Sequence, residues 1–258
     1  MENNTQLAEK DPQKVVSSSP LSEGIPFNPE SFYKLNRVAS YAATPSERAY
    51  QNILVNIKRG YKRLHELEGF MKVKSKEEGI ILIGGGPSIK NKETLEELRE
   101  LSKKYTTIAC GSVHDYLIDN NIIPTYAAAC DPDPVMANYY TKPHKDVIYL
   151  LASSLDVAVY EKLSGYNIVI WHCHSDDYTE IHGILKVEPE YQAVGGGCTV
   201  GMRSMCIAMM LGYSNMHFFG FDSCLDNEQA HHAYEFTDKT EQLGDVHTIR
   251  IGLDTPIG

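Results

Sequence analysis

Two glycine-rich stretches contain residue types that could bind phosphate. The first is GGGPS at 84–88, directly after an apolar run, and the second is GGGCT at 195–199; each precedes a helical pattern. Glycine permits a tight turn and a close ligand, and a helix start offers N–H groups and a positive dipole end to an anion. The candidate anion-binding residues are Gly84, Gly85, Gly86, Pro87 and Ser88, and then Gly196, Gly197, Thr199 and Arg203.

Neither stretch matches a longer phosphate-binding motif. The Walker pattern GxxxxGK[ST] is absent, and Ile89 stands where a dinucleotide fingerprint needs its third glycine. From the residues alone, a phosphate site and a merely tight turn are equally supported for the first stretch. Arg203 likewise fits a solvated surface residue as well as an anion ligand.

Acidic residues and histidines follow other apolar runs. Asp131 and Asp133 lie in CDPDP, where two carboxylates could hold Mg²⁺ or accept hydrogen bonds from a sugar or base. A helix N-cap is the structural alternative, which we favour more for Asp133. Asp222 ends the last run, and His231 and His232 follow in a polar loop. An acid and two histidines suit general acid–base chemistry or metal binding, although a loop histidine pair is more often simply solvated.

A further histidine pair, His172 and His174, follows another apolar run. With Asp176 and Asp177 nearby, it could bind a transition metal. No further motif with zinc spacing accompanies it, so we favour a polar strand exit.

The elements that must position these residues follow from the pattern between 79 and 221. Short runs that are apolar at nearly every position alternate with helical patterns, which is typical of parallel strands buried on both faces. We predict an α/β, Rossmann-like, open and mostly parallel sheet with helices on both faces and a ligand site at its carboxyl edge. The runs lie at 79–84, 106–110, 125–130, 147–153, 167–172 and 216–221, and the helical patterns at 92–105, 113–121, 134–140, 156–165 and 199–213.

The N-terminal part has a different character. Residues 1–24 are polar and are predicted to form a disordered tail, followed by a helical segment at 25–77 and the Rossmann-like domain at 78–258. Thr44, Pro45 and Glu47 are start signals for a long amphipathic helix that we expect to end near Gly69. This helix would pack on the domain or on a second subunit of a homo-oligomer.

The composition argues against several function classes. The net charge is −10 and no basic stripe stands out, which disfavours nucleic-acid binding. No apolar stretch approaches the roughly 20 residues of a membrane span, and the N-terminus lacks a signal-peptide core. We therefore expect a cytoplasmic protein with no membrane partner. The six cysteines form no CxxC pair and are expected to be buried free thiols.

Three stretches together resemble a known family. ILIGGGPSI at 81–89, AACDPDP at 128–134 and GGGCTVGMRSMCIAMMLGYSNMHFFGFDS at 195–223 are similar to the 6-hydroxymethylpterin diphosphokinase MptE-like family, in particular to a branch found in bacteria and phages. Relatives are the motility-accessory-factor proteins of flagellin glycosylation. The GxGPS opening is also similar to that of bacterial sialyltransferases that use CMP-sugars. The resemblance covers roughly residues 79–240.

The resemblance implies a Rossmann-like fold that binds a nucleotide through the first glycine stretch. Gly85 departs from the sugar-transferring relatives, which often have Asn there. The chain ends at Gly258, soon after the histidine loop, which is consistent with a C-terminally incomplete domain. The residues that carry over are Gly84, Gly86, Pro87 and Ser88 for the nucleotide, Asp131 as the acid after the third strand, and Gly196, Gly197, Thr199 and Asp222 for the second loop and its following strand.

The resemblance leaves three functions open. The first is a diphosphokinase that uses Mg-ATP and a pterin-like hydroxymethyl acceptor, with Mg²⁺ on Asp131 or Asp222, and with His231 or His232 as base. The second is a glycosyltransferase that uses a CMP- or UDP-sugar and a histidine base. In both, a nucleotide and a small-molecule acceptor are the partners. The third is a nucleotide-binding module without turnover, whose N-terminal helix and tail bind a partner.

Overall fold

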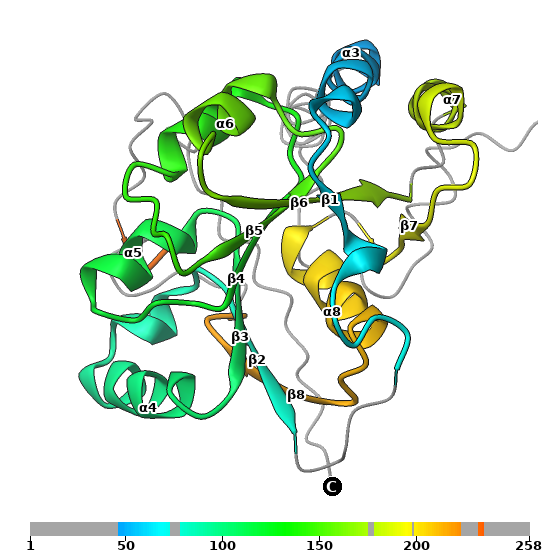
Figure 1. Cartoon of the computed structure of the whole chain (residues 1–258). Coiled ribbons are helices and arrows are strands. Elements are labelled where there is room, and N and C mark those ends of the chain that lie inside the picture. Colours follow the sequence, from blue (N-terminus) through cyan, green and yellow to red (C-terminus); the bar gives the residue numbers. More distant parts are fainter. Residues whose placement is uncertain (1–45, 73–77, 175–177, 198, 223–231, 235–258) are drawn as a thin grey trace, which may run out of the picture. The chain divides into compact units, whose positions relative to one another are not determined.

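The structure is a computed structural model of the chain and describes residues 46–72, 78–174, 178–197, 199–222 and 232–234 (Figure 1). These residues all belong to one unit that spans 44–258. The predicted tail, the start signals Thr44 and Pro45, and His231 lie outside the described residues.

A parallel sheet forms the centre of the described residues. Its strand order is β1-β6-β5-β4-β3-β2-β8, and β7 pairs with β6 outside this path. Each pair of neighbouring strands in this part of the chain is parallel, and Ile81 of β2 lies opposite Thr107 of β3 and His217 of β8. The strands are β1 (Lys62–Arg63), β2 (Gly79–Ile83), β3 (Thr106–Cys110), β4 (Tyr126–Ala129), β5 (Ile148–Ala152), β6 (Asn167–Cys173), β7 (Ala193–Val194) and β8 (Asn215–Phe219).

The central strands are buried on both faces. Ile80 and Leu82 of β2 pack into one hydrophobic cluster, and the alternate residues Ile81 and Ile83 pack into another. Because side chains alternate between the two faces of a strand, a run that is apolar at every position fits a sheet that is covered on both sides.

Helices provide this cover. The helices α4, α5 and α6 pack on the face of Ile81, and α8 packs on the opposite face (Figure 1). The chain moves from β2 to β6 in one direction and then crosses to β8, on the other side of β2. Right-handed crossovers in one direction place their helices on one face, so this reversal puts α8 on the other. The predicted Rossmann-like α/β fold is therefore confirmed. The helices are α3 (Ser46–Asn56), α4 (Lys92–Ser102), α5 (Val113–Asp119), α6 (Val157–Lys162), α7 (Tyr178–Val187) and α8 (Val200–Met210), with 3₁₀ turns η1 (Ile57–Arg59), η2 (Leu64–Glu66), η3 (Pro87–Lys90) and η4 (Pro134–Tyr139).

The N-terminal helix is shorter than the long helix predicted to end near Gly69. Helix α3 has 11 residues, and the turn η1 follows it. Gly60 then has a φ of 73°, in the left-handed region in which helices commonly end. The chain turns there into the edge strand β1. Helix α3 packs against α7 through Ile53 and Ile184, which share a small hydrophobic cluster.

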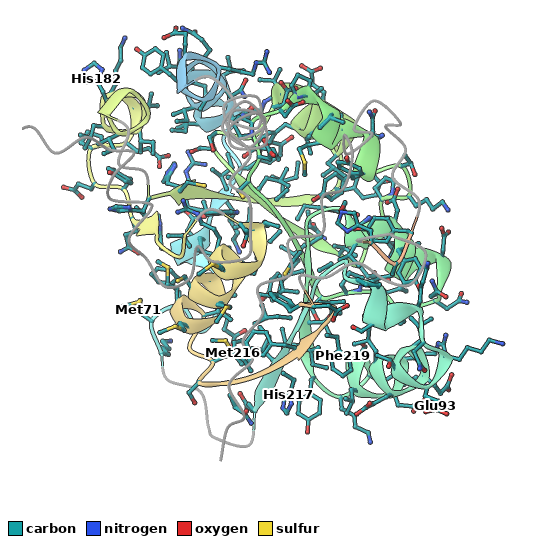
Figure 2. The ribbon with its side chains drawn as sticks, turned by 180° about the vertical axis from the view of Figure 1, so that it is seen from behind. Met71, Glu93, His182, Met216, His217 and Phe219 are labelled. Carbon is teal, nitrogen blue, oxygen red and sulfur yellow. The ribbon has the colours of Figure 1, made fainter. Side chains whose placement is uncertain are left out.

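Strand β8 is more exposed than the sequence predicts. It forms an edge of the sheet, and its backbone pairs with β2 in the described structure. Met216 lies on the α8 side and Phe219 on the opposite side, and both are labelled in Figure 2 together with His217. Phe218 keeps 45% of its surface exposed. Both His217 and Phe218 are exposed, although they point to opposite faces of the sheet, so the run at 216–221 is not buried on both faces as we expected.

Two further expectations concern thiols and membranes. Cys110, Cys130, Cys173 and Cys206 are free; Cys110 is buried, as expected, and the other three are half-buried. Burial raises the pKa of the Cys110 thiol to about 12, so it remains protonated. Among the described residues, no helix combines the length and the apolar character that a membrane crossing requires.

Candidate functional site

The first glycine stretch packs directly against the end of β8. The Gly84 N–H donates to the Phe219 carbonyl at 2.8 Å, and the Gly86 N–H donates to the Gly220 carbonyl at 2.9 Å. A Cβ atom at Gly84 would lie 2.4 Å from the Gly220 carbonyl oxygen. Glycine is therefore required for two backbones to approach this closely. The stretch therefore links the carboxyl ends of β2 and β8. We call this junction the β2–β8 seam.

We expected the hydrogen-bond donors of this turn to bind an anionic ligand, but a carboxylate of the protein accepts their hydrogen bonds. Asp222, just after β8, accepts the Ser88 N–H at Oδ2 and the Ser88 hydroxyl at Oδ1, both at 2.6 Å. Such charge-assisted bonds are those that a phosphate oxygen would accept from the same donors. The structure thus brings together Ser88 and Asp222, which lie far apart in the sequence.

Helix α4 begins at Lys92, where the pattern at 92–105 predicted a helix, and so starts beyond the glycine stretch. The turn η3 comes first, and Asn91 then caps α4 by accepting the N–H groups of Glu93 at 2.8 Å and Thr94 at 3.4 Å. A capping side chain satisfies the N–H groups that an anion would otherwise use. Ser88, rather than the start of α4, therefore provides the donors next to the glycines.

Residues 232–234 return to the same turn. The Ala233 N–H donates to the Gly85 carbonyl at 2.9 Å, and His232 Nδ1 lies 3.3 Å from the same oxygen. A carbonyl oxygen can only accept, so we assign the proton to Nδ1, and the neutral ring then has its lone pair on Nε2. This tautomer suits a general base that acts through Nε2.

Two residues at this turn were not identified from the sequence. The Tyr234 hydroxyl lies 2.5 Å from the Ser112 hydroxyl, and the Tyr234 ring stacks on His232 with centroids 5.1 Å apart and planes 13° apart. Burial raises the pKa of Tyr234 to about 12, although the hydrogen bond with Ser112 opposes this rise. The available signals were the position of Ser112 two residues after a strand and an aromatic residue two positions after the histidine pair.

The second glycine stretch leads into α8. Gly196 and Gly197 have φ values of 105° and 72°, in the left-handed region that favours glycine. Thr199 caps α8 by accepting the N–H three residues later at 3.3 Å. Arg203 donates from Nη1 to the Val194 carbonyl at 2.7 Å, and so links α8 to the end of β7.

The first turn of α8 borders the ends of two strands. A Cβ atom at Gly111, just after β3, would lie 3.2 Å from Val200 Cγ1, and one at Gly201 would lie 2.8 Å from the Phe221 ring, just after β8. Both glycine stretches therefore lie at the carboxyl edge where the strand order reverses, which is the usual ligand position in open parallel sheets.

Asp131 and Asp133 form a turn after β4. Asp133 accepts the Val135 N–H at 2.9 Å and caps η4, and Asp131 Oδ1 accepts the Asp133 N–H at 3.0 Å. The N-cap alternative therefore applies to Asp133. Three strand spacings separate β4 from β8, which corresponds to roughly 14 Å between the strands that precede Asp131 and Asp222.

The Asp131–Asp133 turn fits a Mg²⁺ ion that is also bound by substrate phosphates and water. Proteins commonly hold Mg²⁺ with one or two carboxylates, together with substrate phosphates and water, and Asp131 and Asp133 are such a pair. In the part of the chain that the structure describes, no group of three or more His, Cys, Asp or Glu side chains is placed to hold a metal. The described residues thus suit an ion that arrives with phosphates, and do not form a cage of protein ligands.

His172 and His174 do not act as a pair. His172 is buried, and its Nδ1 lies 2.9 Å from Ser153 Oγ and its Nε2 2.7 Å from Glu188 Oε2. His174 is exposed, and the two aspartates that follow it lie outside the described residues. Burial lowers the pKa of His172, although Glu188 acts in the opposite direction.

A pocket opens beside His172, at the opposite end of the sheet from β8. Trp171, Tyr191, Arg63 and Glu188 are among the residues that line it. Glu188 accepts a hydrogen bond from Arg63 at 2.6 Å and also binds His172, so three of the polar side chains that line this pocket bind one another. We therefore place the candidate site at the β2–β8 seam, where acid, hydroxyl and imidazole groups meet.

Comparison with protein families decides the classification. The model of the family described as 6-hydroxymethylpterin diphosphokinase MptE-like matches residues 51–228, which is more than half of the chain. The chain belongs to the MptE-like family. A search of curated proteins finds no match.

A solved structure shares the fold of this MptE-like chain. It is the MAf glycosyltransferase from Magnetospirillum magneticum AMB-1, with a TM-score of 0.58 and 15% sequence identity. The match covers 72% of this chain and 29% of the glycosyltransferase chain, so the present chain corresponds to less than a third of that protein. The likeness establishes a common fold.

Proposed function

We propose that the chain is a nucleotide-dependent transferase that moves a diphosphate from Mg-ATP to the hydroxymethyl group of a pterin-like acceptor. The description of its family supports this reaction class. The contact of His232 with the Gly85 carbonyl carries the proposal, because it gives the phosphate-type turn an adjacent base. The position of this turn, where the strand order reverses, supports the same site.

The proposed reaction is a displacement at phosphorus. The acceptor hydroxyl oxygen attacks the β-phosphorus of ATP, and a new oxygen–phosphorus bond forms. The bond from the β-phosphorus to the oxygen that bridges it to the α-phosphate breaks, and AMP leaves with that electron pair. His232 Nε2 takes the hydroxyl proton. The products are AMP and the diphosphate ester of the acceptor.

Other residues would bind and orient the nucleotide. A phosphate oxygen at Ser88 would replace the Asp222 carboxylate, because both accept the same two hydrogen bonds. Asp131 and Asp133 would hold Mg²⁺, which neutralises phosphate charge when it is bound. The backbone of Gly84–Gly86 and Pro87 would line the phosphates on one side of the seam. The second stretch would line the nucleotide from the side of α8, through Gly196, Gly197, Thr199 and Arg203.

The test is product analysis with a panel of substrates. The purified chain is incubated with Mg-ATP and 6-hydroxymethyl-7,8-dihydropterin, and AMP and the pterin diphosphate are quantified by mass spectrometry. Loss of the base in His232→Gln should lower kcat by about 10²- to 10⁴-fold. His217→Gln, which changes an exposed histidine of β8, should keep wild-type activity. Equal activity of the His232 variant and the wild type would overturn the assignment of the base.

Transfer from a CMP- or UDP-sugar is the second candidate. The fold shared with the MAf glycosyltransferase favours it, and a histidine would again take a proton from an acceptor hydroxyl. The same panel therefore includes CMP- and UDP-sugars. Release of CMP or UDP from these, without AMP from ATP and the pterin, would replace the first proposal by the second. Binding of a nucleotide without any product would instead support a module without turnover.

A further inference from the structure

Tyr234 contacts His232, the base of the proposed reaction, and is itself fixed by the sheet. Its ring stacks on the His232 imidazole with centroids 5.1 Å apart, and its hydroxyl lies 2.5 Å from Ser112 Oγ. A Cβ atom at Gly85 would lie 2.3 Å from the Tyr234 hydroxyl oxygen, so the tyrosine lies directly over the glycine turn. Tyr234 therefore joins the imidazole, the turn and the exit of β3.

Ser112 is a rigid point of attachment. It follows Gly111, whose N–H donates to the Ala128 carbonyl of β4 at 2.8 Å, so the exit of β3 is tied to the neighbouring strand. The Tyr234 ring also contacts the ring of Tyr116 in α5, with centroids 5.6 Å apart. The Tyr116 hydroxyl donates to the Ile89 carbonyl at 3.2 Å. Tyr234 is thus fixed by β3, by α5 and by the turn after the glycines.

The backbone alone does not fix the imidazole of His232. The Ala233 N–H bond to Gly85 places the chain, but the two side-chain torsions of His232 remain to be determined. A stacked neighbour restricts the plane of the ring, and the Gly85 carbonyl then selects the tautomer that has its proton on Nδ1. The plane and the tautomer together decide where the Nε2 lone pair points.

We propose that Tyr234, held by Ser112, is a positioning residue that fixes the ring plane and tautomer of His232. The proposal rests on the proposed function, since it assigns a role to residues that support its base. Tyr234 takes no proton from the substrate. Because burial raises its pKa to about 12, its hydroxyl stays neutral and bonded to Ser112 throughout the pH range of an ordinary assay. The orientation of His232 should then not vary through ionisation of Tyr234.

Three variants separate the ring from the hydroxyl. Tyr234→Phe keeps the stack and removes the bond to Ser112, Ser112→Ala removes the same bond from the other side, and Tyr234→Leu removes both the stack and the bond. We expect the first two to lower kcat about tenfold with little change in the KM for ATP, and their combination to be no worse than either alone. Tyr234→Leu should lower kcat about 100-fold.

A matched control exists near the amino ends of β2 and β3, away from the carboxyl edge. Tyr105 lies beside His217 with ring centroids 5.8 Å apart, so it forms a tyrosine–histidine pair away from the glycine turn. Tyr105→Phe should keep the wild-type kcat. Circular dichroism and the melting temperature would show that each variant is folded before its kinetics are compared.

A second readout does not need turnover. The ¹⁵N and ¹H spectra of the histidine rings report which nitrogen carries the proton, with His232→Gln used to assign the signal. The wild type should show His232 with its proton on Nδ1, and Tyr234→Leu should show a mixture of tautomers. If the wild type has this tautomer, Tyr234→Leu loses it, and no transfer is detected, the positioning role stands and the proposed function fails. Wild-type kcat and an unchanged tautomer in Tyr234→Leu would overturn the positioning role.

Discussion

At the scale of single residues, the bond between Asp222 and Ser88 has two consequences for ligands. The carboxylate satisfies the Ser88 N–H and hydroxyl, and it also places a negative charge at the turn. A phosphate must therefore compete for these donors and overcome charge repulsion. Asp222 thus holds the turn together without nucleotide and opposes an anion there.

This competition predicts the effect of removing the carboxylate. Asp222→Ala should bind ATP in the absence of Mg²⁺ about fivefold to tenfold more tightly, because the two donors and the charge no longer oppose the phosphate; tenfold corresponds to about 1.4 kcal/mol. Isothermal titration calorimetry measures the change. Ser88→Ala, which lacks the donor hydroxyl, should not gain affinity. Weaker binding by Asp222→Ala would show that the carboxylate helps to hold the nucleotide instead.

Some of these residues could be found from the sequence, and others could not. Glycines before a helical pattern and an acid after an apolar run are local signals, and they identified Gly84–Ser88 and Asp222. The bond between Ser112 and Tyr234 joins residues 122 positions apart, and no local pattern contains such a contact. For the same reason, the sequence suggested a phosphate for the donors of Ser88 but could not show that Asp222 accepts their hydrogen bonds.

At the scale of elements, the start of α4 tests whether this helix takes part in binding. Asn91 satisfies its first N–H groups, so the helix has its own cap beyond the glycine stretch. The C-terminal boundary of α3 also differs from the one we predicted. Gly60 was a visible break inside a helical pattern, and its left-handed conformation ends the helix well before Gly69. The two-residue strands β1 and β7 are too short to leave a recognisable pattern.

Removing the cap of α4 should change stability and leave binding intact. Asn91→Ala should lower the free energy of unfolding by about 1 kcal/mol, because two N–H groups lose their acceptor. Urea unfolding measures this loss, and Asn91→Asp, which can still accept, is the control. The affinity for ATP should remain that of the wild type. A large loss of affinity with an unchanged fold would place the start of α4 in the nucleotide site.

At the scale of the whole described unit, a buried polar network joins elements far from the seam. His172 of β6 binds Ser153 after β5 and Glu188 after α7, and Glu188 binds Arg63 of β1. Burial lowers the pKa of His172, so the folded state favours the neutral ring. An unfolded chain binds this proton near pH 6.5, and protonation therefore favours unfolding as the pH falls below that value.

Because the pKa of His172 is lowered in the folded state, we predict that the free energy of unfolding falls from pH 7.5 to pH 5.5. The positive charges of Arg63 and of protonated His65 lower the pKa of His172 further and strengthen this pH dependence. Glu188 raises the pKa of His172 and weakens it. His172→Gln should be less stable at pH 7.5 by about 1–3 kcal/mol, since it loses buried hydrogen bonds, and its stability should change less with pH. Urea unfolding at both pH values provides the measurement, with His217→Gln as the control. An equal pH dependence in wild type and His172→Gln would exclude His172 as the source.

The strand order explains which large-scale features were predictable. Runs that are apolar at every position indicated a parallel sheet, and the general rule for such sheets placed ligands at the carboxyl edge. The neighbour of β2 could not be read in this way, because nothing in MHFFGF specifies that β8 crosses the whole sheet to pair there. Its edge position also explains the exposure of Phe218, which the apolar run did not suggest.

The pairing of β2 with β8 also affects the order in which the chain can fold during synthesis. Strands β2 to β6 can pair one after another as they leave the ribosome, but the outer edge of β2 must wait until residues 215–219 have been made. Closing such a long loop is slow and leaves a hydrophobic strand edge open to other chains in the meantime. Among the strands that the structure describes, the proposed catalytic seam is therefore also the last pairing to form. A nucleotide that spans it would favour the completed fold over the partly assembled one.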